Sequence, residues 1–110
     1  MKNLKKLDAS GISGLNQLGI YGLDLIKLIV WNNSEIIDAS WMRNLNELDA
    51  SRTCGIDQSG INGLNLIKLD VWNNPKIKNV SWMRNLNKNK SSLIILDLFF
   101  IDKFKRIECL

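Results

Sequence analysis

The hydrophobic residues of this chain recur in one pattern at nearly constant intervals. The pattern L-x-x-L-x-(L/V/A) begins at Leu4, Leu25, Leu45 and Leu66, so the successive spacings are 21, 20 and 21. The alternation of apolar and polar positions within each copy is typical of a short β-strand, because successive side chains of a strand face opposite sides. We therefore expect one short strand in each unit, with its leucine side chains pointing inward.

A longer period joins these units in pairs. The run Leu-Asp-Ala-Ser at 7–10 recurs at 48–51, and the run Trp-Asn-Asn at 31–33 recurs at 72–74, so the offset is 41 in both cases. One unit of this size cannot cover its own apolar side, so successive units have to stack and cover one another. The repeat therefore predicts a stack of short parallel strands that pair in register.

The period and the residue pattern of the units resemble those of leucine-rich repeat proteins. Residues 33–45, and their copy at 74–86, are similar to the run N-x-I-x-D-I-S-x-L-x-N-L of the internalin-like or phosphatase-regulator-like subclass. The residue pattern of the units is also similar to that of repeat arrays of large DNA viruses and protists. The resemblance implies an α/β-type solenoid, a right-handed superhelix with a parallel concave sheet and short 3₁₀ or extended outer turns. We expect a single domain over residues 1–110, with regular repeats over about 4–86 and an irregular repeat or cap over about 87–110.

The segments that return between strands carry their own signals. Glycines such as Gly11, Gly14 and Gly19 in the first unit are expected to break any helix there, so we predict extended or short 3₁₀ returns in the odd-numbered units. In the even-numbered units, apolar residues such as Ile36 and Met42 are predicted to be buried beneath the return.

Three kinds of side chain are expected to hold the turns together. Asn33 and Asn74 follow their strands where a buried turn begins, and an amide there can bond backbone groups that an aliphatic side chain cannot. Cys54 is predicted to be a buried, unreactive thiol, the alternative being a reactive or metal-binding cysteine. Trp41 and Trp82 are predicted to pack between successive turns on the outer face, with a binding role as the alternative.

The side chains that alternate with the inward ones form the predicted concave face. They are Lys6, Asp8, Ser10, Lys27, Ile29, Trp31, Glu47, Asp49, Ser51, Lys68, Asp70, Trp72, Ile95, Asp97 and Phe99. Trp31 and Trp72 are two strands apart, which corresponds to about 10 Å, and Ser51 between them is small enough to leave a notch. Exposed tryptophans of this kind are typical anchors of protein interfaces. The alternative is that both lie flat against the sheet and only shield it.

The predicted partner-binding set is centred on these tryptophans. It consists of Lys27, Ile29, Trp31, Asp49, Ser51, Lys68, Asp70 and Trp72. Asp49, Asp70 and Asp97 would form an acidic column on adjacent strands, which favours a cation or a basic partner. The alternative is an ordinary surface of mixed charge, because lysines share the face, and a flat column offers a metal ion too few converging oxygens.

The amino-acid composition argues against most kinds of catalysis. The chain has 110 residues and a net charge of +4, but it has no histidine, which is the commonest general base and metal ligand. Its seven glycines form no phosphate-binding motif. We therefore expect a protein that is not an enzyme and that has no cofactor, no bound metal and no small-molecule substrate.

Location and partners follow from the remaining features. Two cysteines cannot make a secreted disulfide framework, and the basic residues 1–6 are not followed by the apolar stretch of a signal peptide, so we expect an intracellular, cytoplasmic protein. The longest apolar run, residues 93–101, is too short to span a membrane, but it predicts an edge for association of an otherwise monomeric chain. The basic cluster at residues 103–106 is short and carries no recognition motif, so nucleic acid is disfavoured as a partner.

These observations together predict a non-catalytic module that binds a polypeptide partner on its concave face. The alternative is a truncated or structural fragment of a larger repeat array, with no ligand of its own.

Overall fold

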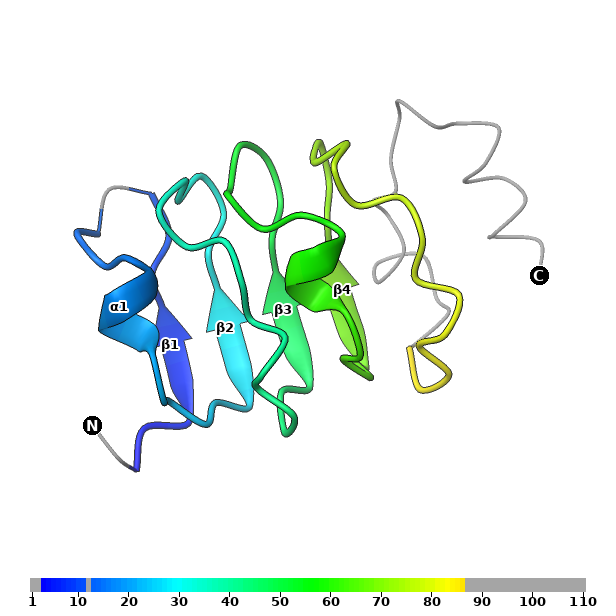
Figure 1. The fold of residues 1–110 in the computed structure, drawn as a ribbon, viewed down its shortest axis with the longest axis horizontal. Coiled ribbons are helices and arrows are strands. Elements are labelled where there is room, and N and C mark those ends of the chain that lie inside the picture. Colours follow the sequence, from blue (N-terminus) through cyan, green and yellow to red (C-terminus); the bar gives the residue numbers. More distant parts are fainter. Residues whose placement is uncertain (1–2, 12, 87–110) are drawn as a thin grey trace.

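The structure, a computed structural model, describes residues 3–11 and 13–86. Four short strands run through this part of the chain: β1 (Lys6–Asp8), β2 (Lys27–Ile29), β3 (Glu47–Asp49) and β4 (Lys68–Asp70). They form one sheet in the order β1-β2-β3-β4, and every pair is parallel (Figure 1). The predicted parallel sheet is therefore confirmed, with one strand in each of the four regular units.

The register of the sheet aligns equivalent residues of successive units. Leu7 pairs with Leu28, Leu28 with Leu48, and Leu48 with Leu69. The central leucines of β2, β3 and β4 are buried, whereas Leu7 in β1 is only half-buried because no strand precedes it in the sheet. Each unit thus covers the apolar side of its neighbour.

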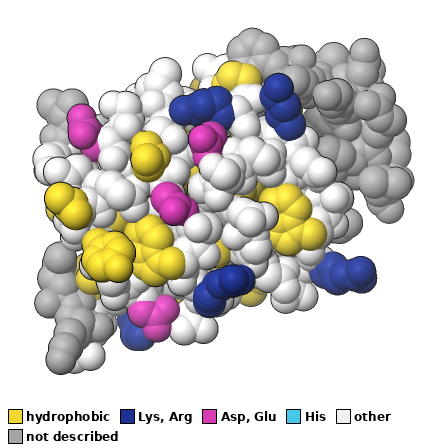
Figure 2. Space-filling view, in the orientation of Figure 1, with side chains coloured by type: hydrophobic (Ala, Val, Ile, Leu, Met, Phe, Trp, Pro, Cys, Tyr) yellow, Lys and Arg dark blue, Asp and Glu magenta, His cyan; other side chains and the backbone are white. Residues whose placement is uncertain are grey.

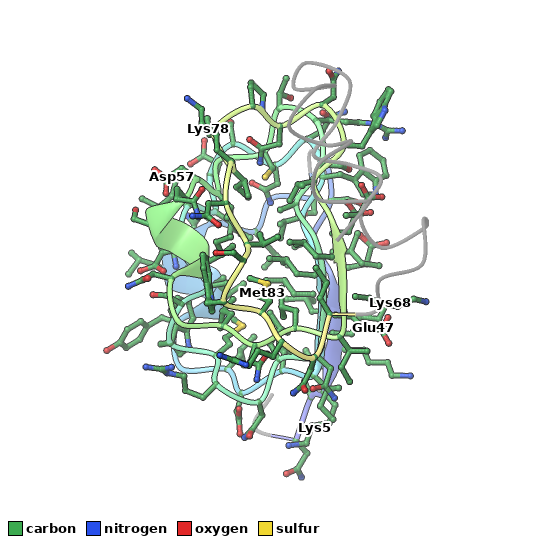
Figure 3. All side chains as sticks on the ribbon, turned by 90° about the vertical axis from the view of Figure 1, so that its right-hand side faces the viewer. Lys5, Glu47, Asp57, Lys68, Lys78 and Met83 are labelled. Atoms are coloured by element: carbon green, nitrogen blue, oxygen red, sulfur yellow. The ribbon has the colours of Figure 1, made fainter. Side chains whose placement is uncertain are left out.

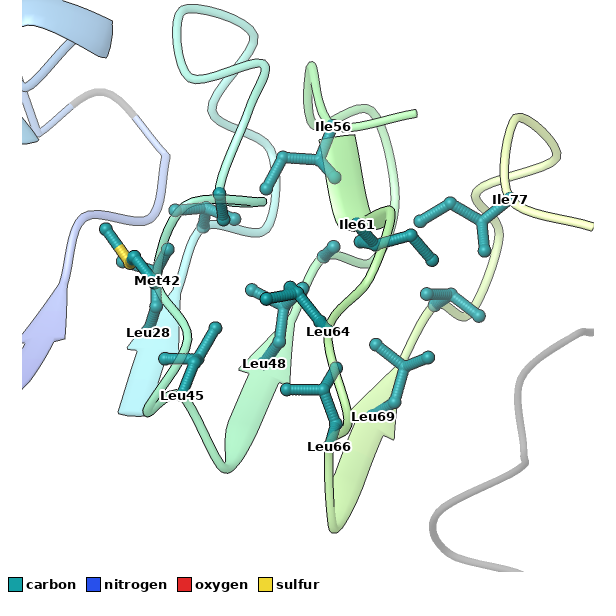
Figure 4. Close-up of a cluster of buried hydrophobic side chains, with 14 of the residues drawn as sticks. Leu28, Met42, Leu45, Leu48, Ile56, Ile61, Leu64, Leu66, Leu69 and Ile77 are labelled. Atoms are coloured by element: carbon teal, nitrogen blue, oxygen red, sulfur yellow. The ribbon is translucent and has the colours of Figure 1, made fainter. Parts of the chain in front are cut away.

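The core lies between the sheet and the return segments, which form a second layer (Figure 3). Figure 4 shows the strand leucines meeting side chains of the returns, among them Met42, Ile61 and Ile77, all three of which are buried. Complete burial of one such side chain stabilises the folded state by about 1.5–3 kcal/mol. The predicted burial of Ile36 and Met42 is confirmed.

The returns of the odd-numbered units contain short helical turns. These are the α-helix α1 (Gln17–Ile20) and the 3₁₀-helix η1 (Ser59–Ile61). The 3₁₀ turn was expected, but the prediction that glycines exclude an α-helix from the first unit is wrong. The side chain of Asn16 caps α1, because its Oδ1 accepts a hydrogen bond from the Gly19 backbone N–H at 2.9 Å.

A glycine in η1 is needed for close packing and does not break the helical turn. A Cβ atom on Gly60 would lie 2.5 Å from the carbonyl oxygen of Ile37 in the preceding unit. The Gly60 carbonyl in turn accepts a hydrogen bond from the Ala39 N–H at 3.0 Å. The missing side chain lets two return segments approach closely enough to pair.

Buried asparagine side chains form one set of hydrogen bonds between successive units. The Nδ2 atom of Asn33 donates to the carbonyls of Ala9 and Leu15, at 2.7 and 3.1 Å. Its Oδ1 atom accepts from the Glu35 N–H. Asn74 makes the equivalent bonds to Ala50, Ile56 and Lys76 one block later. Both asparagines are buried, and their bonds satisfy turn backbone groups, as predicted.

Two glutamines form a second set of bridges that we did not expect. The Oε1 atom of Gln17 accepts from the backbone N–H groups of Ile37 and Asp38, and its Nε2 atom donates to the Asp38 carbonyl. Gln58, the equivalent residue of the second block, makes the same bonds to Lys78 and Asn79. The glutamines therefore connect the helical return of each odd unit to the extended return of the next.

Candidate functional site

The exposed side of the sheet carries the side chains that alternate with the core leucines. We call this surface the open face. In the described part of the chain it consists of Lys6, Asp8, Ser10, Lys27, Ile29, Trp31, Glu47, Asp49, Ser51, Lys68, Asp70 and Trp72. Figure 3 shows Glu47 and Lys68 pointing away from the sheet, on the side opposite Asp57 and Lys78 of the return layer. The predicted members Ile95, Asp97 and Phe99 lie outside the described residues.

Trp31 and Trp72 follow β2 and β4, where parallel pairing continues past the strand ends. The carbonyl of Trp31 accepts from the Gly11 N–H at 2.8 Å, and that of Trp72 accepts from the Arg52 N–H at 2.7 Å. Trp31 is half-buried and Trp72 is 39% exposed. The backbone thus fixes two partly exposed indoles on the same side of the sheet, one unit apart on either side of Ser51.

A hollow is present where the notch at Ser51 was expected, although the Ser51 side chain itself is nearly buried. Ser51 is only 4% exposed, and its hydroxyl donates to Oδ1 of Asp49 at 2.7 Å. The guanidinium of Arg52 lies between the two indoles, 5.0 Å from the ring centroid of Trp31 and 5.7 Å from that of Trp72. A cation therefore occupies the space between the tryptophans, and Ser51 lies beneath the surface.

Sequence reasoning missed Arg52 because it considered only the alternating strand positions. Arg52 has a left-handed backbone with φ +64°, and this turn brings its side chain back over the open face. The equivalent residues of the other units, Gly11, Asn32 and Asn73, have φ angles of 61°, 58° and 60°. Glycine and asparagine are the residues that adopt this conformation most readily, and arginine is not. The available signal was therefore an arginine at a position where the repeat otherwise has glycine or asparagine.

Two carboxylates lie on adjacent strands below this stack. Asp49 and Asp70 pair in register, and each uses Oδ1 for a local bond, to Ser51 and to the Trp72 N–H respectively. Burial raises the pKa of Asp70, and the negative charge of Asp49 raises it further, while the Trp72 N–H and the charge of Arg52 act in the opposite direction. Of the predicted acidic column, Asp97 lies outside the described residues.

Six residues line one open pocket of about 600 Å³. They are Trp31, Asp49, Ser51, Arg52, Asp70 and Trp72, and we call this the tryptophan pocket. Five of the six belong to the predicted partner-binding set. The remaining predicted residues, Lys27, Ile29 and Lys68, line an adjoining pocket over β2–β4. Lys27 forms an exposed ion pair with Glu47 at 3.8 Å, which contributes little to stability.

A larger hollow lies on the return layer, between η1 and residues 75–82. Several of its polar groups are used within the chain: Gln58 bonds residues 78 and 79, Asp57 accepts from Ser59, and Lys76 donates to the Cys54 carbonyl. The tryptophan pocket differs because an aromatic pair and a charged group meet there in a solvent-accessible place.

The other singled-out residues lie in the interior or in the return layer. Cys54 is completely buried, its Sγ donates to the Ala50 carbonyl at 3.2 Å, and burial raises its pKa to about 11. Trp41 and Trp82 are half-buried, and their Nε1 atoms donate to the carbonyls of Leu23 and Leu64. Their predicted packing between turns is confirmed.

The outer face also exposes apolar side chains that sequence reasoning missed. Leu18 in α1 is 82% exposed and Tyr21 is 77% exposed, with the Tyr21 ring 6.1 Å from that of Trp41. Figure 2 shows hydrophobic side chains gathered over this part of the molecule. They provide a second surface against which a role for the open face can be tested.

Within the described ranges, no helix combines the length and the apolar character that crossing a bilayer requires. Comparison of the chain with models of known protein families, with curated proteins and with solved structures finds no match.

Proposed function

We propose that this chain is a leucine-rich repeat solenoid that binds a polypeptide partner on its open face, inside the cell and without catalysis. The observation that carries the proposal is the tryptophan pocket, where two partly exposed indoles from alternate units flank one charged group. Tryptophan is among the residues most enriched at the energetic centres of interfaces. The parallel register supports the proposal further, since it holds both indoles on a rigid backbone before any partner arrives.

A selection of displayed random peptides on the full chain tests the proposal. We expect enriched peptides whose affinity falls at least tenfold with Trp31→Ala and with Trp72→Ala, since truncating an anchor typically costs about 2 kcal/mol or more. The matched control is the double variant Leu18→Ala/Tyr21→Ala, which removes exposed apolar surface from the opposite layer. It is expected to leave affinity unchanged.

Three outcomes would contradict the proposal. Peptides that depend on Leu18 and Tyr21 would move the interface to the outer face. Peptides that lose affinity only when the charges of residues 103–106 are neutralised would move it to the basic cluster. A selection without any enrichment would favour the alternative, a structural repeat fragment with no ligand.

A further inference from the structure

The gap between Trp31 and Trp72 has dimensions that the sheet itself sets. The two residues are separated by two strand spacings of about 4.8 Å each, or about 10 Å. The guanidinium of Arg52 lies over both rings, at 5.0 and 5.7 Å from the two ring centroids. Cations within about 6 Å of an indole centroid are attracted by the ring. The repeat has therefore built a slot in which a guanidinium contacts indoles on both sides.

The present occupant of this slot is held by the two indole faces and by electrostatic attraction to Asp70. Among the described residues, the Arg52 guanidinium makes no hydrogen bond and no ion pair, although Asp49 and Asp70 line the same pocket. The residue is exposed at the surface. This flexible side chain can leave the slot without breaking a hydrogen bond or an ion pair, although it then gives up part of its attraction to Asp70.

The left-handed backbone of Arg52 indicates that its side chain has a specific role at this position. It is the one residue among the four equivalent left-handed positions that is neither glycine nor asparagine. It also occurs in the unit that tryptophans flank on both sides. Unfavourable backbone conformations persist where the surrounding structure uses them, commonly at binding sites.

We infer that the tryptophan pocket is a binding site for a guanidinium group, and that Arg52 is an internal occupant which an arginine side chain of the partner displaces. The inference rests on the proposed function, from which it takes a polypeptide as the partner. When Arg52 leaves, the pocket keeps two indole faces and the carboxylates of Asp49 and Asp70, a combination that complements a planar cation and repels an anion.

Displacement predicts how much the removal of Arg52 changes the affinity for the partner's arginine. A ligand that has to compete with an occupant binds more weakly in proportion to the fraction of time the slot is free. If Arg52 fills the slot nine-tenths of the time, its removal strengthens binding about tenfold. The same removal would weaken binding if Arg52 itself held the partner.

The test uses a small probe, so that no partner has to be known. N-acetyl-arginine amide is titrated into the full-length wild type and into Arg52→Gly, and the indole N–H signals of Trp31 and Trp72 are followed by NMR. We expect the apparent dissociation constant to be about tenfold lower for Arg52→Gly than for the wild type. N-acetyl-citrulline amide, which has the same shape without the charge, should bind at least tenfold more weakly than the arginine probe.

Two further variants control for trivial effects. Asn73→Gly makes the same kind of substitution at a left-handed position that no pair of tryptophans flanks, and should keep the wild-type affinity. Arg52→Gly combined with Trp72→Ala removes one wall of the slot and should abolish the gain.

Two results of the titrations would overturn the inference. Equal affinity of the wild type and Arg52→Gly would overturn displacement, and equal affinity for the arginine and citrulline probes would overturn recognition of the charge. Failure of the proposed function is a separate result, namely a peptide selection that does not depend on Trp31 and Trp72. Peptides that need both tryptophans, together with a probe that does not bind Arg52→Gly, would overturn the guanidinium site alone.

Discussion

Trp31 and Trp72 lie on the open face of the sheet, whereas Trp41 and Trp82 lie in the return layer on the opposite side. Both pairs recur at the same offset along the chain, and all four side chains are only partly buried. The outer pair packs against the core and donates from Nε1 to a carbonyl of the preceding odd unit, at 3.3 Å from Trp41 and 2.7 Å from Trp82. The open-face pair contacts the guanidinium of Arg52 instead.

The comparison shows that position within the repeat decides what a tryptophan does. The outer indoles connect one unit to the next, so their removal affects every contact that depends on stacking. The open-face indoles follow the strand alternation outward, and their rings contribute to a pocket. We therefore expect the outer pair to matter for stability and the open-face pair to matter for binding.

The largest expected effect separates the two pairs directly. Trp82→Ala and Trp41→Ala should each lower the free energy of unfolding by about 2–4 kcal/mol, because they remove core packing and leave a carbonyl without its donor. Trp31→Ala and Trp72→Ala should each cost less than about 1 kcal/mol, which is the scale of an exposed cation–π contact. Urea denaturation of the four variants measures the difference, and equal losses from both pairs would contradict it.

The buried asparagines extend the comparison from the surface to the interior. Asn33 lies two positions after Trp31, and Asn74 follows Trp72 in the same way, yet both amides lie inside the turn. Asn33→Ala and Asn74→Ala should each cost about 1–3 kcal/mol, since backbone carbonyls of the preceding unit would lose their donor. The exposed Asn62 supplies the control, and Asn62→Ala should change the urea midpoint much less. Unchanged midpoints for both buried variants would exclude a stabilising role.

Regular spacing explains what the sequence could predict. A unit of nearly constant length headed by alternating leucines leads directly to a parallel register, and that register places Trp31 and Trp72 on one side. The buried asparagines were predictable because a turn inside the stack has to satisfy its backbone groups. These features depend on periodicity, which a single sequence displays fully.

What could not be predicted depends on local backbone geometry. The left-handed conformation of Arg52 is contrary to the preference of arginine, so its residue type gave no sign that its side chain would lie over both indoles. The α-helix α1 was missed because Gly19 was given its average helix propensity, while the cap from Asn16 and packing against the next unit decide the outcome. The bridges from Gln17 and Gln58 did leave a signal, since these two residues recur at the offset that relates the two blocks.

Two carboxylates of the open face are expected to respond to pH in opposite directions. Burial raises the pKa of Asp70 above its ordinary value, so the charged form is disfavoured in the folded protein and lowers stability at neutral pH. That penalty disappears as the pH falls below the pKa of the unfolded chain, about 3.9. Asp70→Asn should therefore raise the urea midpoint at pH 7 and leave it unchanged near pH 3, an effect smaller than that of either outer tryptophan.

Asp8 supplies the opposite case on the same face. The Ser10 hydroxyl and backbone N–H donate to its carboxylate and lower its pKa, so its charge stabilises the folded state above the unfolded pKa and loses this effect as the pH falls. Asp8→Asn should lower the midpoint at pH 7 and not at acid pH. If Asp70→Asn lowered the midpoint at pH 7, as Asp8→Asn is expected to do, the assignment of Asp70 to a desolvated position would be wrong.

The smallest expected effect concerns the residue between the open-face tryptophans. A side chain in the left-handed conformation costs about 1 kcal/mol relative to glycine, and two exposed cation–π contacts contribute about as much in the other direction. Arg52→Gly should therefore stay within about 1 kcal/mol of the wild type, while Arg52→Ala, which keeps the strain and loses the contacts, should be less stable than Arg52→Gly by about 1 kcal/mol. The exposed Arg84, whose φ is not positive, provides a reversed control: there alanine should be more stable than glycine, because glycine loses more conformational freedom on folding. If Arg52→Ala were as stable as Arg52→Gly or more stable, the left-handed backbone at position 52 would carry no strain. Only the indole contacts and the attraction to Asp70 would then determine how firmly the Arg52 side chain stays in the slot.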